Sequence, residues 1–213
     1  MRFSLEKFSD YPIVIKSIHE ANALTNVLLF DLDETLVSHK SFVYDRILKY
    51  VQTVSNKNWN PELSEKLFSR IEIEGTDGVL DFVVDQLHES ALIEDLLMYL
   101  RTDLGVPTGF FRPGAKETIM KLNENFVLKI CTNGNERQQA IKVDYLNEML
   151  GFKIPTFYCS TIASKPSPLC LIRALEDKSA DHALFIGDSA VDSLAADRAG
   201  VKFLNVSNLL LST

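Results

Sequence analysis

The stretch VLLFDLDET, residues 27–35, decides the fold of this chain. It opens with an unbroken apolar run, which predicts a strand buried on both faces of a parallel sheet. Asp31 and Asp33 follow directly, at the point where such a strand meets solvent. Because side chains alternate along a strand, we expect the two carboxylates to begin with the same orientation.

Two carboxylates this close repel each other unless a cation or a shared proton is present. Oxygen ligands that leave room for several waters suit Mg²⁺, and an aspartate can also act as a nucleophile that forms an aspartyl-phosphate. Acidic residues are also common in turns and helix N-caps, so on Asp31 and Asp33 alone that alternative stays open.

The composition is that of a folded globular protein, with 46% hydrophobic and 24% charged residues among 213. This length suffices for one large domain, or for one domain with a substantial insertion. The net charge of −7 argues against a nucleic-acid partner. No apolar stretch approaches the ~20 residues of a membrane span, so we expect no membrane partner either.

Cysteine use and the first segment of the chain favour a cytoplasmic protein. Cys131, Cys159 and Cys170 lack metal-ligand spacing, and their apolar surroundings predict buried, reduced thiols. Residues 1–26 mix charged and apolar side chains without a signal-peptide pattern, and we expect a cytoplasmic location. Within this segment, 3–8 and 13–23 are compatible with helices.

Beyond the first strand, the spacing of apolar residues changes twice. Residues 42–104 have helical spacing and predict about four helices without a strand. After that, helices and strands alternate, and Gly151 and Gly200 are placed to end two helices. The predicted helices are 113–123, 136–150, 168–177 and 189–199, and the predicted strands are 126–131, 156–159, 183–187 and 202–206.

This alternation predicts an α/β fold, a doubly wound, Rossmann-like parallel sheet split by an inserted α-helical cap. The predicted core comprises residues 1–40 and 108–213, and the predicted cap comprises residues 41–107. In such a sheet, ligands bind in the crevice beyond the carboxyl ends of the strands.

Polar residues suited to a metal and a phosphate follow the strands at that edge. Each has an ordinary alternative as a turn residue, a surface lysine or a helix cap. Independent caps, however, have no reason to gather at successive strand ends in one crevice. Acids around a hard cation, with a hydroxyl and an ammonium around a phosphoryl group, explain them together. Besides Asp31 and Asp33, the residues are Thr132, Asn133, Lys165, Asp188 and Asp192.

These motifs resemble those of the haloacid dehalogenase (HAD) superfamily of phosphatases, in order and across about residues 26–206. The four motifs are Asp31-x-Asp33-x-Thr35, Thr132, Lys165 and Gly187-Asp188-Ser189-x-x-Asp192. Arg112-Pro113-Gly114 and Lys165-Pro166-x-Pro168 further resemble the phosphoglycolate phosphatase-like branch, in which a helical C1 cap follows the first motif.

The resemblance implies a Mg²⁺-dependent phosphomonoester hydrolase that acts on a small phosphorylated metabolite. Asp31 would attack phosphorus, and Asp33 would serve as the acid and then as the base. Asp31, the carbonyl of Asp33 and Asp188 would hold Mg²⁺, with Asp192 orienting its ligands. Thr132, Lys165 and the amide of Asn133 would bind the transferring phosphoryl group, and Lys165 would also neutralise Asp31.

Asp33 distinguishes this activity from that of a dehalogenase, because a halide leaving group needs no acid. A phosphosugar mutase on the same scaffold and a non-catalytic phospho-ligand binding protein remain as alternatives. Glu34 stands where the family most often has glycine, and we expect its side chain to point away from the site without loss of activity. Candidate specificity residues are His39, Tyr44, Trp59 and His88.

Overall fold

The computed structural model describes residues 24–55, 62–63, 65–71, 79, 82–83, 93–100 and 109–206. The segments 3–8 and 13–23, which the sequence leaves open as helices, lie outside these residues, as do Trp59 and His88. The chain divides into two compact units, one of residues 1–37 with 111–213 and one of residues 38–110.

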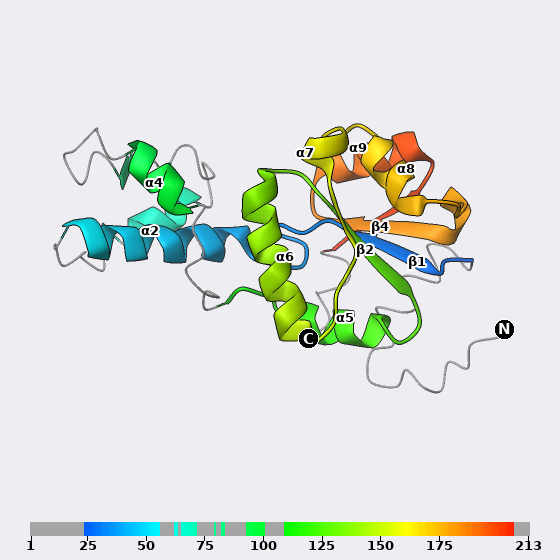
Figure 1. Cartoon of the computed structure of the whole chain (residues 1–213), viewed down its shortest axis with the longest axis horizontal. Helices are drawn as coiled ribbons and strands as arrows, with labels where there is room; N and C mark the ends of the chain where they lie inside the picture. Colours follow the sequence, from blue (N-terminus) through cyan, green and yellow to red (C-terminus); the bar gives the residue numbers. More distant parts are fainter. Residues whose placement is uncertain are drawn as a thin grey trace. The chain divides into compact units, whose positions relative to one another are not determined.

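A five-stranded parallel sheet forms the first unit, in the order β3-β2-β1-β4-β5 (Figure 1). The predicted doubly wound α/β fold is therefore confirmed. Every residue of β1 is buried, as expected for a central strand of a parallel sheet. The strands are β1 (Val27–Phe30), β2 (Val127–Thr132), β3 (Thr156–Tyr158), β4 (Ala183–Gly187) and β5 (Lys202–Asn205).

The register brings the carboxyl ends of the three central strands level. Phe30, the last residue of β1, pairs with Ile130 of β2 and with Ile186 of β4. The backbone N–H of Asp31 still donates to the carbonyl of Ile186 at 2.8 Å. The residues that follow these strands therefore emerge side by side at one edge of the sheet.

Helices cover both faces of the sheet. Right-handed crossovers place the connections from β1 to β2 to β3 on one face, and those from β3 to β4 to β5 on the other, because the strand order runs in opposite directions in the two halves. Figure 1 shows α5 and α6 on one face and α8 and α9 on the other. The helices are α5 (Ala115–Leu122), α6 (Glu136–Leu150), α7 (Cys159–Ile162), α8 (Leu169–Leu175) and α9 (Ala190–Ala199).

The face covered by α8 and α9 contains a fully apolar cluster. Val27 and Leu29 of β1 point into this cluster, where they meet Leu171 of α8 and Ala195 of α9. Alternation along the strand directs the next odd-numbered residue, Asp31, to the same face. The three cysteines also belong to this cluster, and they are buried and free of disulfides as expected.

The predicted bounds of the helices and strands in this unit lie within two residues of those in the structure. Two of the differences involve a glycine and a cysteine. The helix predicted from Pro113 begins at Ala115, because Gly114 takes a left-handed conformation (φ 73°) that an α-helix interior does not allow. The strand predicted through Cys159 ends at Tyr158, and Cys159 instead begins the short helix α7, which the sequence did not indicate. By contrast, Gly151 and Gly200 end α6 and α9 in left-handed conformations, as predicted.

The described part of the second unit, residues 38–110, is helical except at its two ends, residues 38 and 109–110. It contains α2 (His39–Ser55) and α4 (Ile93–Leu100), with further helical residues between them. It has its own apolar core, made of Val43, Ile47, Tyr50, Leu67, Ile71, Val79, Val83 and Leu96. Its use as a cap stays a prediction. Over the described part of the chain, no helix is long and apolar enough to cross a membrane.

Candidate active site

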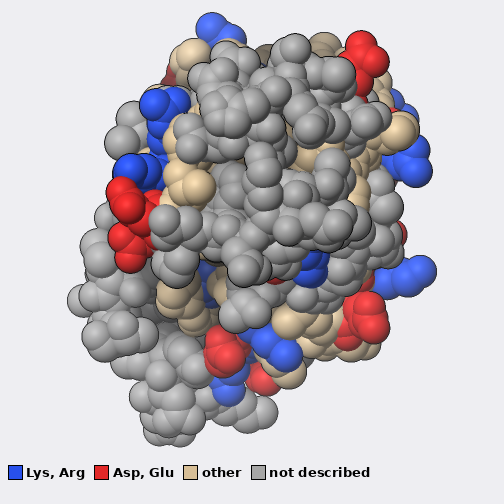
Figure 2. Space-filling model, turned by 90° about the vertical axis from the view of Figure 1, so that its left-hand side faces the viewer, with Lys and Arg blue, Asp and Glu red and all other residues tan. Residues whose placement is uncertain are grey.

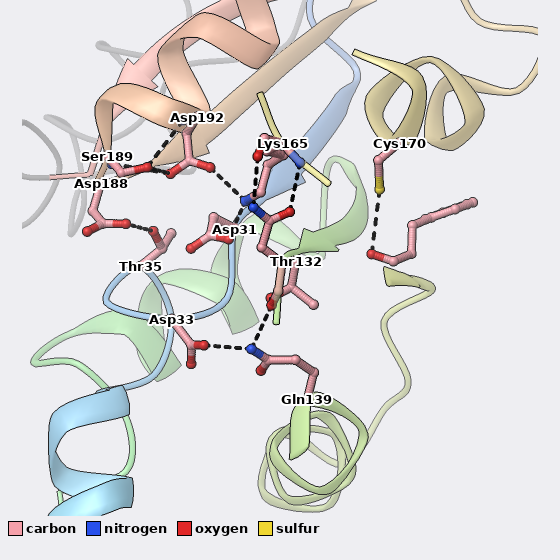
Figure 3. A network of polar contacts seen from close by, with 12 residues as sticks. Asp31, Asp33, Thr35, Thr132, Gln139, Lys165, Cys170, Asp188, Ser189 and Asp192 are labelled. Atoms are coloured by element: carbon pink, nitrogen blue, oxygen red, sulfur yellow. Dashed lines mark hydrogen bonds and ion pairs between the residues drawn. The ribbon is translucent and has the colours of Figure 1, made fainter. Parts of the chain in front are cut away.

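A buried ammonium group lies between two carboxylates at the carboxyl edge of the sheet. The Nζ of Lys165 is 2.5 Å from Oδ1 of Asp31 and 2.6 Å from Oδ1 of Asp192. The side chains of Lys165 and Asp192 are each 2% exposed, and that of Asp31 is 9% exposed. Figure 3 shows the three groups converging from β1, from the segment before α8 and from α9.

Burial and neighbouring charges shift the pKa values of Asp31 and Lys165 in opposite directions. Burial raises the pKa of Asp31 to about 7, although the Lys165 ammonium beside it acts to lower that pKa. Burial alone would lower the pKa of Lys165, but the carboxylates of Asp31 and Asp192 outweigh burial and raise it above its ordinary value. Lys165 is therefore a fixed positive charge, and Asp31 is the acid whose charge state responds to its surroundings.

Asp192 connects this ion pair to the start of α9. One of its oxygens accepts from Lys165, and the other accepts from the backbone N–H (3.2 Å) and hydroxyl (2.6 Å) of Ser189. Ser189 in turn accepts from the backbone N–H of Asp192, which completes a capping box. Asp192 thus caps α9 and also belongs to the site, so its two predicted roles do not exclude each other. Gly187 allows this approach, since a Cβ atom there would lie 2.8 Å from the Asp192 carboxylate.

Asp188 stands at the outer side of the cluster and is more exposed than Asp31 and Asp192. Its Oδ1 accepts from the hydroxyl of Thr35 at 3.4 Å, and its carbonyl accepts from the amide of Asn205 in β5 at 3.2 Å. Burial and the charge of Asp192 raise its pKa above the ordinary value. The last strand thus supports the Asp188 loop through Asn205.

Asp33 does not share the orientation of Asp31, which corrects the expectation from strand alternation. The strand ends at Phe30, and residues 33–37 form a turn closed by the bond from the Glu34 N–H to the Val37 carbonyl at 2.8 Å. The Asp33 carboxylate therefore points toward α6 (Figure 3). There Oδ1 lies 2.6 Å from Nζ of Lys142, and Oδ2 accepts from Nε2 of Gln139 at 2.7 Å. Asp31 and Asp33 therefore pair with different lysines, Lys165 and Lys142.

Thr132 and Asn133 lie at the end of β2. Thr132 is buried, and its hydroxyl donates to the carbonyl of Asn133 at 3.1 Å. The Asn133 side chain accepts from the backbone N–H of Lys165 at 2.8 Å and donates to its carbonyl at 3.1 Å. Sequence reasoning considered only the backbone amide of Asn133. Its side chain holds the backbone of Lys165 in place.

Glu34 occupies a left-handed conformation (φ 56°), which explains why glycine suits this position. Arg112 Nη1 donates to the Glu34 carbonyl, and the same nitrogen lies 3.7 Å from the Glu34 carboxylate. The charge of Glu34 contributes to the raised pKa of Asp188. The Glu34 side chain therefore pairs with Arg112, and its charge still acts on Asp188.

The donor set fits a hard divalent cation. Carboxylate oxygens of Asp31, Asp188 and Asp192 lie within 4.8 Å of one another. With Asp33, the site has four carboxylates against the ammonium groups of Lys165 and Lys142, which leaves a formal charge of −2 if all are ionised. Oxygen-only ligands and a net negative charge are what Mg²⁺ requires.

Of the predicted site residues, all seven lie at this edge of the sheet. The sequence missed Gln139, Lys142 and Asn205. Gln139 and Lys142 were detectable as polar residues at helical spacing on the stripe of α6 that contains the buried Val143 and Leu146. Of the candidate specificity residues, His39 begins α2, and Tyr44 packs edge-on against Phe68 with ring centroids 5.3 Å apart.

The chain matches known proteins along most of its length. The family model for the haloacid dehalogenase-like hydrolases covers residues 28–206. A comparison with curated proteins finds no match.

Three solved structures illustrate the similarity of fold. A HAD-superfamily hydrolase (subfamily IA, variant 1) from Geobacter sulfurreducens PCA has 22% identity and a TM-score of 0.60, over 84% of this chain and 86% of that one. YfnB from Bacillus subtilis, a HAD-hydrolase bound to magnesium, has 22% identity and a TM-score of 0.59, over 84% and 85%. A HAD family hydrolase from Deinococcus radiodurans R1, with bound phosphate and sodium, has 20% identity and a TM-score of 0.56, over 86% and 81%.

Identities this low show the fold alone, and the family model carries the assignment. It runs from β1 through β5 and spans every motif at the carboxyl edge of the sheet. The chain belongs to the haloacid dehalogenase-like hydrolase family.

Proposed function

We propose that this protein is a Mg²⁺-dependent phosphomonoester hydrolase that acts on a small phosphorylated metabolite through an aspartyl-phosphate on Asp31. The observation that carries the proposal is the Lys165 ammonium held between Asp31 and Asp192, with Asp188 close by. Such a cluster combines an anionic nucleophile, a fixed cation for phosphoryl oxygens and oxygen ligands for a metal. These are the requirements of phosphoryl transfer, in which positioning and charge stabilisation dominate.

The proposed metal site uses Asp31, Asp188 and the backbone carbonyl of Asp33, with Asp192 orienting the ligands. The Asp192 carboxylate is less available than those of Asp31 and Asp188, since both its oxygens already accept from Lys165 and Ser189. When bound, Mg²⁺ would supply positive charge to the phosphoryl oxygens and favour the ionised form of Asp31. The magnesium and phosphate bound by two structural relatives agree with this proposal.

The chemical steps assign one task to each acid. A carboxylate oxygen of Asp31 forms a bond to phosphorus while the bond from phosphorus to the ester oxygen breaks. Asp33 gives a proton to the leaving alkoxide. A water molecule then gives a proton to Asp33 and forms a bond to phosphorus while the bond from phosphorus to the Asp31 oxygen breaks. This step releases phosphate and restores the Asp31 carboxylate. Thr132, Lys165 and the Asn133 amide bind the phosphoryl oxygens in both steps.

Asp33 is the reason to prefer a phosphatase to a dehalogenase in this family. An alkoxide leaving group needs a proton, whereas a halide does not. Asp33 is a quarter exposed, so it is accessible to a leaving group in a way that the buried Asp31 is not. We therefore assign the role of acid to Asp33 and the role of nucleophile to Asp31.

The helical unit of residues 38–110 is proposed to act as the cap that closes over the substrate and excludes water. A capped site favours a small metabolite over a polymer. On the face drawn in Figure 2, the described basic and acidic side chains are interspersed, and they form no large basic patch among themselves of the kind that a nucleic acid would need. We also propose a cytoplasmic location, with which the three buried cysteines, free of disulfides, agree.

Hydrolysis of para-nitrophenyl phosphate tests the proposal. We expect phosphate release that requires Mg²⁺ and that falls by about 10³-fold or more in Asp31→Asn. A phospho-ligand binding protein would bind inorganic phosphate with Mg²⁺ but release none from the ester. A phosphosugar mutase would isomerise sugar phosphates rather than hydrolyse them. Full turnover by Asp33→Asn would contradict the acid–base assignment, and a screen of phosphomonoesters would then identify the substrate class.

A further inference from the structure

Two polar residues occupy the buried face of α6, where the helical period requires apolar ones. Gln139 is 4% exposed and Lys142 is 0% exposed, in line with the buried residues Val143 and Leu146. Burying a lysine costs free energy unless its charge is paired. The informative feature is therefore the partner that these two side chains share.

That partner is the carboxylate of Asp33, which α6 holds at both oxygens. Oδ1 lies 2.6 Å from Nζ of Lys142, and Oδ2 accepts from Nε2 of Gln139 at 2.7 Å. Two donors from one rigid helix fix the rotation of the carboxylate as well as its position. A third contact extends the arrangement, because Nε2 of Gln139 also donates to the carbonyl of Asn133 at 2.7 Å. Asn133 in turn holds the backbone of Lys165.

The turn before α6 is shaped to admit Gln139. Gly134 has φ 108°, a conformation that favours glycine, and a Cβ atom there would lie 2.5 Å from Nε2 of Gln139. Any other residue would push the Gln139 amide away from Asp33 and Asn133. The sequence Thr132-Asn133-Gly134 thus provides both a phosphoryl-binding turn and the space for a side chain of α6.

Stability alone does not explain this arrangement. A buried ion pair is often no more stable than apolar side chains of the same volume, because desolvation offsets the attraction. Two apolar residues at positions 139 and 142 would pack this face of α6 as well. What they could not do is orient the carboxylate of Asp33.

We propose that Lys142 and Gln139 are positioning residues, which hold Asp33 in the orientation that proton transfer to the leaving group needs. The proposal rests on the proposed phosphatase function and extends it to α6. Proton transfer depends steeply on geometry, and a displacement of about 1 Å is enough to cost roughly 100-fold in rate. Loss of either side chain should therefore impair the step that uses Asp33 and leave the phosphoryl-binding contacts in place.

The leaving group distinguishes this role from a structural one. Phenyl phosphate has a basic leaving group that needs a proton, whereas 2,4-dinitrophenyl phosphate has a weakly basic one that does not. We expect Lys142→Met to lower kcat/KM for phenyl phosphate by roughly 10- to 100-fold, and for the dinitrophenyl ester by less than about threefold. Gln139→Met should show the same selectivity with a smaller loss, because Lys142 still holds Oδ1. It also carries the test if Lys142→Met does not fold.

Two controls accompany these variants. Lys129→Met removes another buried lysine of the same unit, one that pairs with the carbonyl of Ala174 at 2.7 Å and with Glu176 instead of Asp33. Its ratio of activities on the two esters should equal that of the wild type. In the Asp33→Asn background, Lys142→Met should cause no further loss on phenyl phosphate, since the residue it positions is already disabled.

Equal losses on both esters, or losses that multiply with Asp33→Asn, would overturn the positioning role. If the wild type is active and the variants keep its activity ratio, the positioning role fails while the proposed function stands. If the wild type with Mg²⁺ hydrolyses neither ester, the proposed function fails, and the positioning role fails with it.

Discussion

Replacing Lys165 by methionine removes the single charge that Asp31 and Asp192 share. The ammonium makes contacts of 2.5 and 2.6 Å, and all three side chains are at least nine-tenths buried. Removing one partner of a buried ion pair costs about 3–5 kcal/mol, because the remaining charge is left without a partner. We expect Lys165→Met to lose about 4 kcal/mol of unfolding free energy near pH 8 without Mg²⁺.

The loss should be smaller in acid. The folded-state pKa of Asp31 is raised to about 7, so the stability tied to its protonated form is present at low pH and is lost as pH rises toward 7. Near pH 5.5, Asp31 already carries its proton in the wild type, and Lys165→Met then breaks only the pair with Asp192. We therefore expect the loss to fall to about 2 kcal/mol near pH 5.5.

Urea unfolding followed by circular dichroism at the two pH values measures both differences. Hydrogen exchange of the β1 and β4 amides assigns the loss to the unit that contains the sheet. Lys129→Met is the matched control, and it should lose about 1 kcal/mol equally at both pH values, because its charged partner Glu176 is exposed. The electrostatic account of the cluster is refuted if Lys165→Met loses no more than this control, or loses the same amount at both pH values.

Three further predictions concern the same unit. Gly187→Ala places a Cβ atom 2.8 Å from the Asp192 carboxylate without backbone strain, so it should lower stability by about 1–3 kcal/mol and reduce Mg²⁺-dependent activity, as thermal unfolding and turnover will show. Mg²⁺ must displace the proton of Asp31, so its affinity should weaken about tenfold per pH unit below 7, with proton release visible by calorimetry in two buffers. Glu176 has a positive φ of 54° after α8 and also pairs with Lys129, so Glu176→Gly should be more stable than Glu176→Ala by about 1 kcal/mol in urea, because both lose the carboxylate and only glycine relieves the strain; equal stabilities would contradict the strain.

Local patterns were enough to predict most of the sheet and its helices. The apolar run before Asp31, the spacing of helix 136–150 and the glycines at 151 and 200 act over short distances, and each was recovered in the structure. The exceptions are also local: Gly114 delays the start of α5, and Cys159 leaves β3 to begin α7. Four residues of helix are too short for a periodic signal to reveal them.

The sequence predicted which residues form the site better than it predicted which side chains they contact. The order of motifs along alternating strands and helices placed all seven residues at one edge, because parallel strands bring their carboxyl ends together. Asp33 was the exception in orientation, since the strand ends at Phe30 and strand alternation no longer applies beyond it. Asn133 was predicted for its backbone, whereas its side chain makes the contacts with Lys165.

From the sequence alone come the family motifs, the α/β alternation and the identity of the acids, because these depend on residue type and on periods of two and 3.6 residues. The resemblance already implies that Lys165 neutralises Asp31, whereas only the tertiary structure decides that Asp33 meets Lys142 and that Asp192 shares Lys165. Lys165 is 134 residues from Asp31, and Lys142 is 109 residues from Asp33. No local pattern joins positions so far apart. The packing of α6 and of the segment before α8 against the sheet joins them, and it gives the two acids separate partners and, in our proposal, separate tasks.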